Sequence, residues 1–568
     1  MPVEPISAAY PTRRLRADVA EPEPAVGLPA ATAIWIAIAG AFALLYAGSL
    51  DLNEAEAHLG LSIAAGLGPF GQVFGGWDPS VWPAQVAAGR LWAWADGGRV
   101  LAGTVRWPAA IAGVLLGAFL SRRLTAALGP RAGVLAGLAW FGCLGLVDGP
   151  GGFAAMMITF LGSCLGLDPR ALLSGLGTPP GVDLIAGLGV VAALDRIINR
   201  GTGWVAGLWA ALAFLAGGWP PLVVIALATV VLGRRGSTLS WKLALPPLVA
   251  AVAWSAWALR ASPAAWGAAL TLPLTQRSAW LLAPEVALLS LPWGPLALLA
   301  TRRSVRIGWA DEGKSLVFGW LQVAGAAALA GTLIPGLAAA ARLPALAGLA
   351  VAAAACADRA WAGELAPASR RLVLVVGLNV ATLWAALIVP GGSYLAMAIA
   401  YYRPIALGLV VLGIATSLAA LGGALTGRPR WALGAVLAVA VGLKVAHAGI
   451  YVPESNYRLS QGPWGRAIGQ WVPPKWPIYT LHPWPVSLAF ATGHPVRQIV
   501  DERLLSDLPG PRPQFVLLQP EEFEHWRPSA PKLIKVRTFQ DEAGRPRVLA
   551  RTEGEFAWYR LVKEASKE

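Results

Sequence analysis

The sequence predicts an α-helical, polytopic membrane protein with about 13 transmembrane helices and a small C-terminal α/β domain. The chain of 568 residues is 56% hydrophobic and 13% charged, whereas soluble domains average about 25% charged residues. Its mean hydropathy is +0.58. Apolar runs of about 20 residues, the length that spans the hydrocarbon core of a bilayer, recur along the chain until about residue 450.

The first segments predict the topology. Residues 1–28 are polar and proline-rich and carry three arginines, which indicates a cytoplasmic N-terminal tail under the positive-inside rule. The apolar run 30–50 is too long for the core of a signal peptide and matches a first span. The run 101–120 then returns the chain to the cytoplasmic side at an arginine pair, so residues 51–100 form an outer loop.

Arginine clusters between later apolar runs mark further cytoplasmic connections. Residues 151–180 break at proline-containing turns and are predicted as an interfacial helix and loop on the outer side. The proline-containing turn at 217–221 is compatible with two interpretations, a pair of spanning helices or a re-entrant hairpin. The spans predicted for the transmembrane domain, residues 29–450, are 30–50, 101–121, 132–149, 181–198, 202–217, 218–233, 241–260, 281–301, 315–336, 337–357, 371–390, 404–424 and 431–450.

The C-terminal segment, residues 451–568, differs in composition from the rest. Charges, prolines and β-rich runs at 477–481, 514–518 and 533–536 predict a soluble α/β domain. The parity of the spans places it outside the membrane, on the face of the outer loop. From this placement we expect the domain and the loop to enclose a site together.

The composition also excludes several function classes. The formal charge is +14, but the cations lie mostly in short connections, where topology places them, so no nucleic-acid partner is expected. A P-loop and a dinucleotide-binding glycine fingerprint are absent from the sequence, which leaves ATP-driven transport unsupported. The cysteines and the histidines of the C-terminal domain lack metal-ligand spacing. We expect no zinc and no cofactor, and leave a divalent cation open.

An acidic cluster follows the first span directly, with the sequence Asp51-Leu52-Asn53-Glu54-Ala55-Glu56-Ala57-His58. Ionised groups are costly in hydrocarbon, so carboxylates at the outer end of a membrane helix commonly line a polar cavity or a catalytic site. Solvated loop carboxylates at the start of a helix are the alternative interpretation. The residues alone leave both open.

Several motifs follow this cluster in a defined order: Trp82-Pro83, Gly89-Arg90-Leu91-Trp92, Arg106-Trp107-Pro108-Ala109-Ala110 and Ser121-Arg122-Arg123-Leu124. Together they resemble GT-C fold glycosyltransferases, in particular the superfamily of aminoarabinose transferases and protein O-mannosyltransferases. The motifs support the resemblance over about residues 45–235. It implies transfer of a sugar from a polyprenyl-phosphate donor to a lipid, glycan or protein acceptor at the outer face of the plasma membrane.

The resemblance implies a carboxylate that acts as general base on the acceptor hydroxyl. The family usually has an Asp-Glu pair in the first loop, and this chain has Asn53-Glu54 at that pair. We therefore favour Asp51 as the base and Glu54 as its helper. Asp183 resembles the family's second acidic position, although a charge that complements the dipole of a helix start explains it equally. Asp148 competes for the same role.

The resemblance also implies cations that neutralise the departing lipid phosphate. Arg106 lies in a matched motif, and Arg90, Arg277 and Arg342 are the other predicted donor-phosphate ligands. Taken singly, each of these arginines is alternatively an interfacial residue that snorkels to lipid headgroups. Further outer cations, whose roles stay open, are Arg99, Arg260, Arg403 and Lys444, the last one helical turn from His447.

Two other function classes stay open at this point. Asn53, and Trp82-Pro83-Ala84 in place of the family's Lys-Pro-Pro-Leu, favour a catalytically degenerate protein that binds polyprenyl lipids. A secondary transporter or lipid carrier would also have many spans, but it commonly shows inverted repeats, which this sequence lacks.

Overall fold

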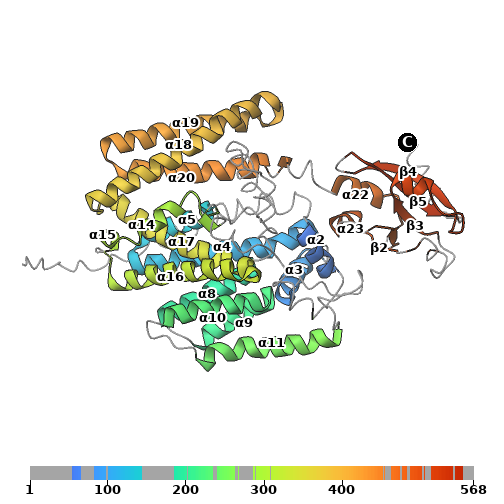
Figure 1. Cartoon of the computed structure of the whole chain (residues 1–568), viewed down its shortest axis with the longest axis horizontal. Helices are drawn as coiled ribbons and strands as arrows, with labels where there is room; N and C mark the ends of the chain where they lie inside the picture. The colour runs from blue at the N-terminus through green and yellow to red at the C-terminus, as the bar shows by residue number, and fades with distance from the viewer. Residues whose placement is uncertain are drawn as a thin grey trace, which may run out of the picture.

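The computed structural model consists of a helical bundle with a C-terminal domain at one end (Figure 1). The bundle and domain are described over residues 54–64, 82–97, 100–143, 184–200, 203–233, 240–261, 267, 286–287, 289–306, 309–451, 453–454, 462–473, 476–482, 486–499, 501, 505, 513–541 and 544–553.

Within these ranges, seven helices are long and apolar enough to cross a bilayer. They are α4 (Ala102–Leu128), α11 (Trp241–Ala261), α16 (Asp311–Leu333), α17 (Ala338–Ala362), α18 (Pro367–Ala398), α19 (Arg403–Thr426), which follows the 3-10 turn η6 (Ala400–Tyr402), and α20 (Pro429–Ala446), which continues into the π-helical turn η7 (His447–Tyr451).

Among the described residues, helices of 13 to 17 residues also belong to the bundle. They are α5 (Pro130–Gly142), α8 (Leu184–Arg200), α9 (Trp204–Gly217) and α10 (Trp219–Gly233). At 1.5 Å per residue, α9 and α10 are roughly 20 Å long, which is less than the roughly 30 Å of a bilayer core. They meet at Gly218, whose φ of 75° is a left-handed conformation that glycine adopts without strain.

The predicted membrane-protein fold is confirmed, and most predicted spans coincide with a helix. The span predicted at 281–301 is wrong in the described part of that segment. A turn at Ser290–Trp293 precedes a helix of six residues, α14 (Gly294–Leu299). Pro292 and Pro295 lack the N–H groups that a continuous helix needs, which explains the break. The predicted first span, 30–50, and the interfacial stretch, 151–180, lie outside the described residues.

The core of the bundle is built around α17. In its most apolar window 83% of the residues are buried, and it packs against α16, α5 and α14. A Cβ atom at Gly348 would lie 2.4 Å from the carbonyl oxygen of Trp320 on α16. Glycine is therefore required for the close approach of α16 and α17, as at many membrane helix interfaces.

The C-terminal domain contains a five-stranded mixed sheet of strand order β2-β1-β3-β5-β4. The strands β1, β2 and β3 are parallel, and β5 pairs antiparallel with both β3 and β4. The three predicted β-rich runs fall on β1, β3 and β4. The elements are α22 (Gly462–Gly469), β1 (Ile478–Thr480), α23 (Val486–Thr492), β2 (Val496–Gln498), β3 (Phe515–Leu518), α24 (Pro520–Glu524), β4 (Leu533–Gln540) and β5 (Pro546–Thr552).

Two helices, α2 (Glu54–Ala64) and α3 (Pro83–Ala95), lie between the bundle and the C-terminal domain (Figure 1). We call this end of the bundle the domain end. The N-terminus of α4 packs there, and its 27 residues carry the chain about 40 Å toward the opposite end, which we call the far end. The far end contains the ion pairs Arg123–Asp195 and Arg131–Asp358.

Candidate functional site

The candidate site is at the domain end, where α2 carries the second half of the acidic cluster. Glu54 is the first residue of α2. Ala57, Gly60 and Ile63 follow at helical spacing and are buried, so they form the face of α2 that packs against the protein. The sequence predicted a polar loop with a helix start here, and the structure places a three-turn helix.

Glu56 of α2 forms a bidentate ion pair with Arg106 of α4. The guanidinium donates from Nε to Oε1 at 2.8 Å and from Nη2 to Oε2 at 2.7 Å. Both side chains are largely buried, with 12% and 19% of their surface exposed. Such fork-to-fork pairs are stronger than single hydrogen bonds and fix orientation. The predicted phosphate ligand Arg106 therefore holds α2 against α4 in this structure, and its partner Glu56 was not singled out from the sequence.

Arg90, another predicted phosphate ligand, also contacts α2. Its Nε donates to the carbonyl oxygen of Ile63 at 3.3 Å, which satisfies one of the acceptors left open in the last turn of α2. A bond to a carbonyl leaves the charge of the guanidinium uncompensated. The same is true of the predicted outer cation Arg403, whose Nε donates to Ala396 O at 3.0 Å. Lys444 Nζ donates to Cys143 O at 2.7 Å.

The C-terminal domain docks on α2 through α23. Val486 and Phe490 of α23 pack on a small cluster that includes Ile63 and Val105. A Cβ atom at Gly60 would lie 2.7 Å from the ring of Phe490. The absence of a side chain at this position of α2 therefore allows the domain to sit close, and α2 and the domain lie at the same end of the bundle. The outer placement of this end stays a prediction.

Arg342 lies near the start of α17, in the core of the bundle. It is 2% exposed, and the adjacent Leu343 packs against Gly187 of α8. A snorkelling arginine keeps its head group in water or among lipid headgroups, and burial inside the protein argues against that alternative for Arg342. The predicted role of Arg342 as a donor-phosphate ligand stays a prediction.

An aromatic cluster surrounds the base of α3. The ring of Trp82 lies 6.0 Å from Phe214 of α9 and 5.7 Å from Trp254 of α11. The side-chain amide of Gln85 donates to Ala216 O at 2.8 Å. The family that the sequence resembles has its Lys-Pro-Pro-Leu pattern at the position of Trp82. In this chain Trp82 is a packing residue that connects α3 to α9 and α11.

The remaining predicted site residues are not placed by the structure. Asp51, Asn53, Asp148, Asp183, Arg99 and Arg277 lie outside the described residues, and Glu54 is described only as the first residue of α2. Among the described residues there is no group of three His, Cys, Asp or Glu side chains that could hold a metal ion.

Comparison with known proteins identifies the fold. No protein-family model and no curated protein matches the sequence. Two crystal structures of ArnT from Cupriavidus metallidurans match over nearly the whole chain, one in the apo state and one bound to undecaprenyl phosphate. The chain has the GT-C fold of ArnT.

The likeness to ArnT extends over both parts of the molecule. The apo structure matches with a TM-score of 0.61 and 16% identity, covering 92% of this chain and 98% of that chain. The undecaprenyl-phosphate complex matches with a TM-score of 0.62 and 16% identity, covering 91% and 97%. A match over more than nine tenths of both chains confirms the fold that the resemblance in the sequence motifs implied.

Proposed function

We propose that the protein is an integral membrane glycosyltransferase that moves a sugar from a polyprenyl-phosphate donor to a lipid, glycan or protein acceptor. The observation that carries this proposal is the ArnT fold across more than nine tenths of both chains, including a homologous structure with undecaprenyl phosphate bound. In this proposal the protein resides in the plasma membrane with a cytoplasmic N-terminus, and the domain end faces the extracytoplasmic side.

The charge distribution at the domain end supports a phosphate-binding role. Arg90 and Arg403 donate to carbonyl oxygens and keep their full charge, and Arg342 adds a buried cation. A positive potential in a partly desolvated site stabilises a phosphate leaving group. We assign donor-phosphate binding to Arg342, Arg277 and Arg90. Arg106 would serve as a further ligand where the phosphate displaces Glu56, and otherwise positions α2.

The proposed chemistry is a direct displacement at the anomeric carbon. The carboxylate of Asp51, helped by Glu54, takes the proton of the acceptor hydroxyl as its oxygen bonds to the sugar, and Asp183 orients the acceptor. The bond from the anomeric carbon to the phosphate oxygen breaks, and the polyprenyl phosphate leaves with the bonding electrons. A single base and a good leaving group need no covalent intermediate, so the reaction inverts the configuration.

A transfer assay tests the proposal. The purified full-length protein is reconstituted with a radiolabelled polyprenyl-phosphate sugar and membrane-extracted acceptors, and transfer is measured for the native protein and for Asp51→Asn. Removal of a general base lowers the rate by about 10²- to 10⁴-fold. Asp311→Asn is the matched control, because the Asp311 side chain is 99% exposed at the far end, and it retains the native rate.

A second candidate function is a polyprenyl-lipid-binding protein without transferase activity. Asn53 replaces an acid of the family pair, and the carboxylate of Glu56 is already engaged by Arg106, which favours this candidate. The same reconstituted protein distinguishes the two functions when donor binding is measured beside transfer. Donor binding without transfer in the native protein supports the second candidate and contradicts the first.

A further inference from the structure

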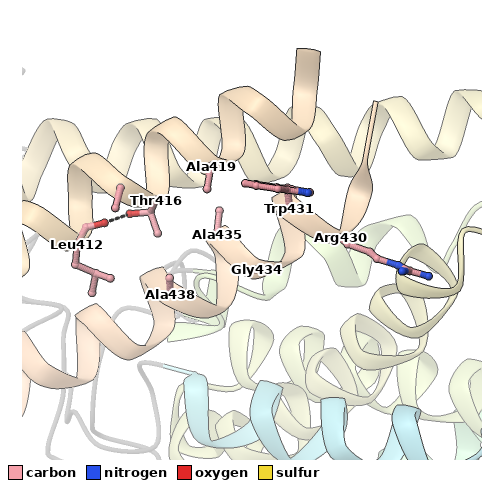
Figure 2. Close-up of a pocket in the computed structure, with 9 residues that line it drawn as sticks. Leu412, Thr416, Ala419, Arg430, Trp431, Gly434, Ala435 and Ala438 are labelled. Atoms are coloured by element: carbon pink, nitrogen blue, oxygen red, sulfur yellow. Dashed lines mark hydrogen bonds between the residues drawn. The ribbon is translucent and has the colours of Figure 1, made fainter. Parts of the chain in front are cut away.

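Helices α19 and α20 enclose a groove near the far end of the bundle, on the flank formed by α18, α19 and α20 (Figures 1 and 2). Its volume is about 390 Å³, within the range of about 300–1,000 Å³ found for ligand pockets. It runs along two turns of each helix, from Leu412 to Ala419 on α19 and from Trp431 to Ala438 on α20, a length of about 10 Å.

Small residues leave this groove open. Ala419 faces Gly434 and Ala435 across it (Figure 2), and a Cβ atom at Gly434 would meet nothing within 4 Å. Beside the groove, the two helices are in close contact at Gly423, where a Cβ atom would lie 2.8 Å from Cβ of Trp431. The groove is therefore a space between helices that touch next to it, not a gap between separate elements.

The groove is apolar and faces the lipid. The Thr416 hydroxyl donates back to the carbonyls of Leu412 and Gly413 in its own helix, so it offers no donor to a ligand. Two neighbouring residues of α19, Val411 and Leu418, are 66% and 64% exposed on the bundle surface. An occupant of this groove must accordingly be a hydrocarbon.

The far-end rim of the groove is cationic and aromatic. Trp431 is 52% exposed there, in the manner of interfacial tryptophans at headgroup depth. Arg370 and Arg430 are exposed and each donates from Nε to a backbone carbonyl, Gly427 O and Trp361 O, at 2.8 Å. These bonds fix the guanidinium groups at the rim without neutralising them. Arg428, also exposed, is the N-cap residue of α20.

We propose that this groove binds one acyl chain of an anionic glycerophospholipid in the far-end leaflet, with the headgroup phosphate beside Arg370, Arg428 and Arg430. The charge of the rim complements an anionic headgroup, and each arginine near the membrane surface contributes about 1 kcal/mol of attraction. A transmembrane helix of a second copy fits less well, because a helix about 10 Å wide needs a longer seam than two turns.

Photocrosslinking of lipids tests the site independently of any transferase activity. The full-length protein is placed in nanodiscs that contain phosphatidylglycerol with a diazirine in its acyl chain, and labelled peptides are identified by mass spectrometry. We expect labelling to concentrate on residues 412–438. Gly434→Leu fills the groove without a backbone clash, and we expect it to lower the labelling of residues 412–438 to the labelling measured on α11. Gly325→Leu is the matched control, because Gly325 is exposed on α16 and its Cβ position is also open.

The headgroup is tested by a second comparison. Arg428→Gln lowers the preference for phosphatidylglycerol over phosphatidylcholine by about fivefold, whereas Arg303→Gln, an exposed arginine of the far-end helix α15 (Arg303–Arg306), leaves it unchanged. Equal labelling of native and Gly434→Leu protein overturns the proposal, and so does equal labelling by the two lipids. Crosslinks between two copies of α20 would assign the groove to self-association instead.

Discussion

The arginines of the bundle bond to two kinds of partner, and both kinds occur at each end: Arg370 and Arg430 bond to carbonyl oxygens at the exposed far end. At the far end, arginines meet carboxylates of neighbouring helices: Arg123 bonds to Asp195 at 2.9 Å, and Arg131 to Asp358 at 2.5 Å. At the domain end, Arg90 and Arg403 bond to carbonyl oxygens, whereas Arg106 pairs with Glu56. Ion pairs neutralise charge and lock helices together, whereas carbonyl bonds position a cation and preserve its charge. The comparison teaches that the bonding partner of an arginine, more than its location, separates a structural role from an anion-binding one.

The largest expected effect separates two arginines of one helix. Arg342→Gln removes the buried cation at the domain end of α17, and we expect the rate of sugar transfer to fall about 10²-fold, as for the loss of one group that stabilises developing negative charge. Arg359→Gln, at the far end of α17 where Arg359 pairs with Glu364, is the matched control and keeps the native rate per folded molecule. Equal losses in both variants would remove the distinction between the two ends.

A second prediction concerns stability at the far end. Asp195 is 1% exposed and accepts hydrogen bonds from Arg123 and Asn199. Asp195→Ala leaves the guanidinium of Arg123 without its buried partner, so we expect the protein to lose about 2 kcal/mol of stability, measured by thermal unfolding in detergent. Asp311→Ala, on an exposed side chain, changes stability by less than about 0.5 kcal/mol. If folded Asp195→Ala protein transferred sugar more slowly than the native protein, the far end would take part in function, which contradicts this prediction.

Substitutions in the pair Glu56–Arg106 are expected to have a smaller effect on the rate of sugar transfer. Glu56→Gln and Arg106→Gln each loosen α2, and we expect transfer to fall about tenfold in each. The double variant is no worse than either, which corresponds to a coupling energy of about 1.4 kcal/mol in a double-mutant cycle. Additive losses in the cycle would instead show that Arg106 acts on the donor phosphate directly.

The smallest expected effect tests the docking of the C-terminal domain. Gly60→Ala places a methyl group 2.7 Å from the ring of Phe490, and we expect a loss of about 1 kcal/mol, since overpacking at a close contact forces the ring to move. Limited proteolysis between the bundle and the domain reports the change. Gly325→Ala, at an open helix position, is the control, and equal cleavage of the two variants would contradict the contact.

The sequence predicts the bundle better than the site. Apolar runs and arginine clusters are local signals, and the helices from α16 to α20 coincide with predicted spans because length and hydropathy decide them. The break after Ser290 was missed, since two prolines stand within an otherwise apolar run. The bond of Arg106 to Glu56 joins positions 50 apart in the sequence, and the contact of Gly60 with Phe490 joins two folding units. Such pairings depend on tertiary packing, which no local pattern encodes.

Compartment mapping in intact cells tests the central claim most directly, namely that the end carrying α2 and the C-terminal domain is the extracytoplasmic one. Ser529→Cys, exposed in the domain, and Thr301→Cys, exposed at the far end, are each treated with a membrane-impermeant maleimide. Of the three native cysteines, Cys143 and Cys356 are buried and Cys164 lies outside the described residues, so the unsubstituted protein supplies the background. We predict labelling of Ser529→Cys in intact cells and of Thr301→Cys only after permeabilisation, and the reverse pattern would contradict the account.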